Sequence, residues 1–132
     1  MKKDAVQVVI LNDEGNVLAV SRKTDHSDFG LPGGKVESCD RNLINAAIRE
    51  VKEETGLDIY NLELIYATHK KGRMGYTYFA EGSGEINYDQ TSEPHVVKWS
   101  NFQEIINGSF GEWNYEVYKS LLSKGIKVNL DK

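Results

Sequence analysis

Cysteine, proline and long apolar runs are all scarce in this chain of 132 residues. Its single cysteine, Cys39, excludes an internal disulfide framework. Its longest apolar runs are far shorter than the roughly 18 residues that a membrane-spanning helix needs. The N-terminus also lacks the apolar stretch and cleavage site of a signal peptide. We therefore expect a cytoplasmic protein with no membrane partner.

The chain also has no excess of basic over acidic residues. Sixteen Lys and Arg stand against 20 Asp and Glu, which gives a net charge of −4. Proteins that bind long nucleic acids usually present a basic surface, so the composition argues against such a partner. The length is close to the commonest size of a domain, and no repeat or linker interrupts the chain. We therefore predict one domain over residues 1–132.

Apolar, β-branched segments alternate with turn signals along the chain. Strands are expected over residues 5–11, 17–20, 57–68, 74–81 and 96–99, with a short extended piece at 35–37. One helix is expected to begin at a cap on Asp40 or Asn42 and to end at Gly56. Helical turns are expected at 101–106, a helix at 113–123, and a strand or an extended tail at 126–130. This order predicts an α/β (α+β) fold with a mixed sheet and helices on both faces.

Three carboxylates lie together on the first predicted helix. Four residues at helical spacing predict the buried stripe of that helix: Ile44, Ile48, Val51 and Thr55. With about 100° per residue, Glu50, Glu53 and Glu54 share another side. Clustered carboxylates repel one another, and Mg²⁺ or Mn²⁺ relieves that repulsion because hard cations prefer oxygen ligands. On charge pattern alone, the alternative is an ordinary solvated helix face.

Two adjacent glycines, Gly33 and Gly34, come shortly before this helix. Glycine allows a close approach and leaves backbone carbonyls and amides free to meet a metal or a phosphate. A Gly-Gly pair on its own is usually only a turn. Beside three carboxylates, the pair instead favours a site that handles phosphate groups.

These two stretches together resemble the signature of the Nudix hydrolase family. Residues 49–57 match its second half, Arg-Glu-aliphatic-x-Glu-Glu-x-Gly-aliphatic, and Gly34 matches its opening glycine. Asp40 stands where the family has Glu, and eight residues rather than seven separate it from Arg49. The sequence leaves open whether Asp40 still contacts Arg49 across this longer loop.

The resemblance implies a Nudix-type α/β/α sandwich, with a central mixed sheet and flanking helices, and a MutT-like nucleotide pyrophosphohydrolase. It implies that Glu50, Glu53 and Glu54 bind Mg²⁺ (or Mn²⁺), with the Gly34 carbonyl as a further ligand. Arg49 would position the glutamates. The metal would neutralise phosphate charge and orient the attacking water.

Such a hydrolysis needs a general base, and the sequence offers two candidates. One is Glu53. The other is Glu93, which is followed by Pro94 in the polar stretch 82–93, since several family members use a glutamate from a later loop. The alternative for Glu93 is a solvated loop acid.

Substrate contacts are expected from Gly33, Arg22, Tyr76 and Tyr78. The two tyrosines share one face of a predicted strand and offer a surface for stacking on a nucleobase. Aromatic residues on strands more often serve packing, which is the alternative here. Arg22, like the basic cluster Lys70–Arg73, would meet distal phosphates or simply be solvated.

The predicted function is therefore Mg²⁺-dependent hydrolysis of a pyrophosphate bond in a nucleoside di- or triphosphate derivative. A dinucleoside polyphosphate or ADP-ribose hydrolase is the alternative within the family. A non-catalytic, nucleotide-binding regulatory domain on the same fold is another alternative. An acidic helix on an unrelated α/β domain would predict no effect of Mg²⁺ on stability. The expected partner is a small nucleotide, and the sequence carries no signal for an oligomeric state.

Overall fold

The structure is a computed structural model that describes residues 3–87 and 95–131. Its strands and helices form two compact units, each built from two stretches of the chain. The first unit takes the described residues up to Val9 and those from Pro32 to 87. The second takes Ile10–Leu31 and residues 95–131. No helix in the described ranges is long and apolar enough to cross a membrane.

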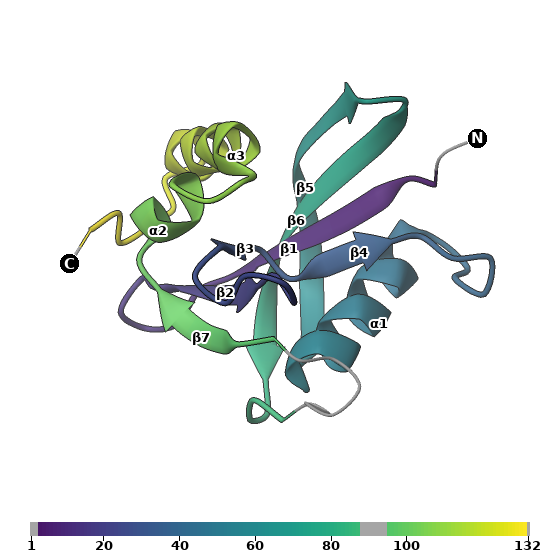
Figure 1. Cartoon of the computed structure of the whole chain (residues 1–132), viewed down its shortest axis with the longest axis horizontal. Helices are drawn as coiled ribbons and strands as arrows, with labels where there is room; N and C mark the ends of the chain where they lie inside the picture. Colours follow the sequence, from purple (N-terminus) through teal and green to yellow (C-terminus); the bar gives the residue numbers. More distant parts are fainter. Residues whose placement is uncertain (1–2, 88–94, 132) are drawn as a thin grey trace. The chain divides into compact units, whose positions relative to one another are not determined.

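The first unit combines a four-stranded sheet with one helix. The strands, in their order across the sheet, are β4 (Gly33–Lys35), β1 (Ala5–Ile10), β6 (Arg73–Ser83) and β5 (Asp58–Lys70). β1 pairs antiparallel with β4, and β5 pairs antiparallel with β6. The turn between β5 and β6 is tight, with Lys71 and Gly72 both at positive φ. The helix α1 (Leu43–Thr55) packs against β4 and β5 (Figure 1).

The ends of α1 follow the capping signals in the sequence. Asn42 precedes the helix, and its side chain accepts a hydrogen bond from the backbone N–H of Asn45. Gly56 ends the helix with φ of 84°, and its N–H donates to the Lys52 carbonyl. A side chain at Gly56 would collide with the backbone oxygen of Asn87. Glycine is therefore required here for both its conformation and its size.

The buried face of α1 is rotated away from the predicted one. Val51 is fully buried as predicted, but Ile44 and Ile48 are 42% and 37% exposed, so the prediction for these two residues is wrong. Ala46 and Ala47 are buried instead, because their small side chains let the helix approach the sheet closely. The rotation brings the acidic side of the helix toward β4.

β5 is the edge strand of the sheet, and its pairing with β6 is irregular. The register shifts once between Tyr60 and Glu63 and again between Leu64 and Tyr66. Asn61, inside the first shift, has a positive φ of 55°. Extra residues of this kind bend a strand and increase its twist.

The second unit combines a three-stranded sheet with two helices. Its elements are β2 (Val17–Ser21), β3 (Phe29–Gly30), β7 (Val97–Ser100), α2 (Phe102–Ile106) and α3 (Gly111–Ser123). The strands are antiparallel in the order β3-β2-β7. The sequence did not predict β3, which lies in a polar stretch. Its two residues pair with Val20 and Ser21. The observed elements confirm the α+β class predicted from the sequence.

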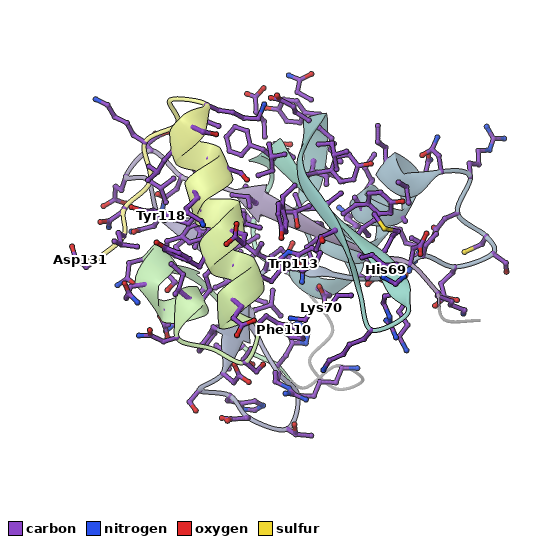
Figure 2. The ribbon with its side chains drawn as sticks, turned by 90° about the horizontal axis from the view of Figure 1, so that it is seen from above. His69, Lys70, Phe110, Trp113, Tyr118 and Asp131 are labelled. Atoms are coloured by element: carbon purple, nitrogen blue, oxygen red, sulfur yellow. The ribbon has the colours of Figure 1, made fainter. Side chains whose placement is uncertain are left out.

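Aliphatic and aromatic side chains from β2 and from the two helices fill the core of this second unit. The fully buried ones include Leu18, Phe102, Ile105, Val117 and Leu121. The ring of Tyr118 packs on that of Phe102, with 5.7 Å between the ring centroids. Phe110 lies at the start of α3 and Trp113 in its first turn, away from Tyr118 farther along the helix (Figure 2).

Residues 126–130 form an extended tail, the second of the two predicted alternatives. The carbonyls of Asn129 and Leu130 accept hydrogen bonds from the N–H groups of Phe102 and Gln103. These N–H groups have no partner inside α2, because they belong to its first turn. The tail also donates from the Asn129 N–H to the Gly15 carbonyl. It therefore caps α2 and links that helix to the turn before β2.

Candidate metal and phosphate site

The residues of the predicted signature come together where α1 packs against β4. They are Gly33 and Gly34 on β4, and Arg49, Glu50, Glu53 and Glu54 on α1. The Gly33 N–H donates a hydrogen bond of 2.8 Å to Glu54 Oε1. The Glu50 carboxylate fills the space that a side chain at Gly34 would occupy. The absence of side chains at both glycines thus lets two glutamates lie directly against the strand.

The Arg49 guanidinium is shared by three carboxylates. Its Nε and Nη2 donate to the two oxygens of Asp40, both at 2.8 Å. Its Nη1 lies 3.3 Å from Glu50 Oε2 and 3.2 Å from Glu53 Oε1. Nη2 also donates to the Lys35 carbonyl at 3.2 Å. One positive charge therefore orients three negative ones and ties them to the strand.

The longer loop before α1 keeps the contact between Asp40 and Arg49, which the sequence had left open. The additional residue is accommodated by a turn, in which the Asp40 N–H donates to the Glu37 carbonyl at 3.0 Å. In return, the Glu37 N–H donates to Asp40 Oδ2 at 2.8 Å. The hydrogen bonds from Arg49, and then the one from Glu37, lower the pKa of Asp40 to about 2.

The low pKa of Asp40 predicts a stability that depends on pH. Because the folded-state pKa lies below the unfolded one, ionised Asp40 stabilises the fold. This contribution is complete above about pH 4, the usual pKa of an aspartate, and is lost as the pH falls through about 2. An Asp40→Asn variant should therefore melt below the wild type at neutral pH, and the gap should close toward pH 2. Thermal unfolding across this range tests the prediction, and a gap that stays constant with pH would contradict it.

Glu50 and Glu53 lie in contrasting surroundings. The side chain of Glu50 is 15% exposed, and that of Glu53 is 60% exposed. Burial raises the pKa of Glu50, and the charge on Glu53 raises it further, while Arg49 acts in the opposite direction. The charge on Glu50 is therefore incompletely compensated, which is the condition that a bound cation relieves.

The donor groups fit a hard divalent cation, although they do not form a closed cage. In residues 3–87 and 95–131, no three His, Cys, Asp or Glu side chains are arranged to hold a metal ion. The glutamates face Arg49 and the Gly33 N–H instead. Mg²⁺ typically keeps several waters and takes only one or two protein carboxylates, so a cage of three is not required. The desolvated Glu50 beside Gly34 and the exposed Glu53 would supply such oxygens.

The remaining predicted site residues lie outside α1 and β4, or outside the described residues. Tyr76 and Tyr78 both lie on β6 in the first unit. Tyr78 is only 6% exposed, and burial raises the pKa of its hydroxyl, so most of this side chain is packed inside the unit. Arg22 lies in the second unit, just after β2, with its Nη1 3.8 Å from Asp28 Oδ2. Glu93 lies outside the described residues.

The basic cluster predicted near residue 70 lies at the tip of the β5–β6 hairpin. His69 and Lys70 end β5 and are exposed there (Figure 2). Lys70 pairs in register with Arg73 at the start of β6. Sequence reasoning missed two other features of this unit. One is the Lys35 carbonyl, which no side-chain motif could reveal. The other is Gln7, a lone polar residue in the apolar strand β1.

The NUDIX domain family matches this chain over residues 1–121. An ADP-ribose pyrophosphatase from Methanocaldococcus jannaschii is 34% identical over 71 residues, which are 51% of this chain and 41% of that protein. The chain therefore spans less than half the length of this relative.

Solved structures resemble the chain over most of its length. A MutT NUDIX hydrolase from Burkholderia pseudomallei is 26% identical, with a TM-score of 0.63 over 76% of this chain and 83% of that one. A MutT structure from work on Aliivibrio salmonicida and Vibrio cholerae reaches 0.75, with 20% identity over 94% and 99% of the two chains. An ADP-ribose pyrophosphatase from Streptococcus suis reaches 0.74, with 18% identity over 94% and 92%. The last two likenesses concern the fold alone.

The match over 121 residues shows that the chain belongs to the Nudix family. Members of this family are pyrophosphohydrolases that act on small nucleotide substrates and typically use a divalent metal.

Proposed function

We propose that this chain is a divalent-metal-dependent pyrophosphohydrolase that cleaves a pyrophosphate bond in a nucleoside di- or triphosphate derivative. The observation that carries the proposal is the packing of Glu50 and Glu54 against Gly34 and Gly33. Arg49 is the group that orients Glu50 and Glu53 beside them. This arrangement places acidic side chains next to partly exposed strand backbone, which a divalent cation would convert into a site for phosphate.

In this proposal, Glu50, Glu53, Glu54 and the Gly34 carbonyl are the groups that would hold Mg²⁺ or Mn²⁺. When bound, such an ion neutralises phosphate charge and lowers the pKa of a water. Arg49 acts on the glutamates rather than on the substrate, because its donors already face carboxylates and the Lys35 carbonyl.

Proton transfer is the second task of the chain's own residues. Glu53 is the candidate base, since its side chain is 60% exposed and open to a water. Its carboxylate takes the proton while the water oxygen bonds to phosphorus. The bridging P–O bond then breaks, and the leaving phosphate oxygen keeps the electron pair. Glu93 is the alternative base, and we retain Arg22, Tyr76 and Tyr78 as proposed substrate contacts.

ADP-ribose is the second candidate substrate. The chain is 34% identical over 71 residues to the ADP-ribose pyrophosphatase of Methanocaldococcus jannaschii, and this similarity favours ADP-ribose. ADP-ribose contains the same chemical bond, so the two candidates differ in the group beyond the pyrophosphate rather than in mechanism.

A substrate panel measured with and without metal tests the proposed function. The purified chain is incubated with 8-oxo-dGTP, other nucleoside triphosphates, ADP-ribose and dinucleoside polyphosphates. We expect release of nucleoside monophosphate from at least one of them with Mg²⁺, complete loss of this activity with EDTA, and its return when Mg²⁺ is restored. We also expect Mg²⁺ to raise the melting temperature, because it relieves repulsion among the glutamates.

Two outcomes would contradict the proposal. Nucleotide binding without turnover of any panel member would favour a regulatory domain on this fold. If the chain binds no nucleotide and Mg²⁺ does not change its melting temperature, the acidic side of α1 is only a solvated helix face.

A further inference from the structure

The side chain of Gln7 is a feature of the first unit that packing alone does not explain. Gln7 lies on β1 between Val6 and Val8, which are both fully buried. Because side chains alternate along a strand, Gln7 points to the face opposite these valines. Its Oε1 is covered from solvent and has no hydrogen-bond partner in the part of the chain that the structure describes. A buried acceptor without a partner is costly, so a donor from outside this set of residues is expected to meet it.

One other oxygen in the described residues shares this condition, but its side chain is anchored. Asn114 Oδ1 is also buried and without a partner. Its Nδ2, however, donates to the Ile105 carbonyl at 3.0 Å and so holds α3 to α2. That hydrogen bond accounts for the presence of an amide at Asn114. Among the described residues, no hydrogen bond of the Gln7 side chain accounts for an amide there in the same way.

Gln7 lies one strand away from the candidate site. Its partner across the β1–β4 ladder is Gly33, whose N–H donates to the Glu54 carboxylate at 2.8 Å. The two backbones approach so closely that a Cβ at Gly33 would lie 2.8 Å from the Gln7 Cα. On its other side, β1 neighbours β6, the strand that carries Tyr76. Neighbouring strands are about 4.8 Å apart, so Gln7 lies within the length of one nucleotide from Gly33.

We propose that Gln7 Oε1 accepts a hydrogen bond from the nucleoside part of the substrate and thereby helps to select it. This inference rests on the proposed pyrophosphohydrolase function. The donor is an N–H of the nucleobase or an O–H of the ribose, since both satisfy an amide oxygen. A site built to bond a substrate donor rejects the analogue that lacks it, because the buried acceptor is then left unpaired. Gln7 thus determines specificity through binding and leaves the chemical step to the acidic cluster.

The test replaces Gln7 with Met, which has a similar length and no hydrogen-bonding amide. The matched control is Gln103→Met, since the Gln103 amide in α2 already donates to Asn107. For each protein, KM and kcat are measured with ATP, with dATP, and with purine riboside triphosphate, which lacks the amino group of the base. If the wild type does not turn these over, dissociation constants with Mg²⁺ replace KM.

We expect Gln7→Met to raise KM about tenfold, which corresponds to about 1.4 kcal/mol, while kcat is unchanged. The variant should also lose the discrimination of the wild type against one analogue. If the variant no longer discriminates against purine riboside triphosphate, the donor belongs to the base. If it no longer discriminates against dATP, the donor belongs to the ribose. The melting temperature of Gln7→Met should equal or exceed that of the wild type, because an unpaired buried acceptor has been removed.

Other results would overturn the inference. If the wild type is active and Gln7→Met keeps its KM and its preference among the three nucleotides, Gln7 does not read the substrate. A lower melting temperature with unchanged KM would show a purely structural role. If the wild type neither cleaves nor binds any nucleotide, both the inference and the proposed function fail. If the wild type is active and the Gln7→Met variant has the same kinetic constants, only the inference fails.

Discussion

Replacing Glu53 with Gln should lower kcat/KM by roughly 10²–10⁴-fold, the usual contribution of a positioned acid or base. The carboxamide has nearly the same size but takes no proton and carries no charge for a metal. The fold should survive, since the Glu53 side chain is 60% exposed and substitutions at exposed positions typically change stability by only about 0.5 kcal/mol. Initial rates on the best panel substrate, with Mg²⁺ titrated, provide the measurement.

The matched control for this variant is Glu14→Gln in the turn before β2. Glu14 is also exposed, and it lies outside the acidic side of α1. Its replacement should leave both activity and Mg²⁺ dependence unchanged. A folded Glu53→Gln enzyme with wild-type kcat and wild-type Mg²⁺ dependence would remove Glu53 from the proposed site and transfer the role of base to Glu93.

The second large effect is expected from Gly34→Ala. The added Cβ would lie 2.6 Å from Glu50 Oε1 and equally close to the rest of that carboxylate, so Glu50 must move. The end of a glutamate side chain is flexible, and the move therefore costs little stability. It displaces a proposed metal ligand, and misplacement of reacting groups by about 1 Å can cost roughly 10²-fold in rate. Activity should fall to that extent while the melting temperature stays close to that of the wild type.

Gly33→Ala is the informative contrast, because its neighbours are backbone atoms. A Cβ at Gly33 would collide with the Val6 carbonyl and lie 2.8 Å from the Gln7 Cα. Neither can move without disturbing β1, so this variant should lose about 1–3 kcal/mol of stability, as overpacked interiors do. The two variants, compared by thermal unfolding and by activity, separate function from fold. If Gly34→Ala retained full activity, the position of Glu50 beside β4 would have no role in catalysis.

Much of the fold could be predicted from local signals. The cap and the stop each adjoin the helix that they bound, so sequence alone locates Gly56 and narrows the cap to Asp40 or Asn42, of which the structure uses Asn42. The rotation of α1 could not be predicted in this way. Periodicity marks Ile44 and Ile48 as apolar, but the closeness of the sheet decides that Ala46 and Ala47 face it instead.

The residues of the candidate site also differ in whether local sequence signals could identify them. The glutamates of α1 and the glycines of β4 could be named from their spacing, because one helix and one nearby strand carry them. The Lys35 carbonyl and Gln7 Oε1, which has no hydrogen-bond partner among the described residues, could not be named, because both depend on which strands lie side by side. Asp40 was an intermediate case. Its residue type suggested a partner for Arg49, but only the turn from Glu37 to Asp40 shows how the longer loop keeps the contact.

The irregular strand β5 has a consequence for how copies of this protein behave in solution. Its 13 residues form one edge of a sheet, and Tyr60 and Leu64 are each 47% exposed on it. A long, straight edge with exposed apolar residues is a template on which a second molecule can add a strand, which is the first step of aggregation. The two register shifts and the positive φ of Asn61 interrupt the row of backbone groups that such a strand would need. The protein thereby keeps a long exposed edge without offering a continuous surface for polymerisation.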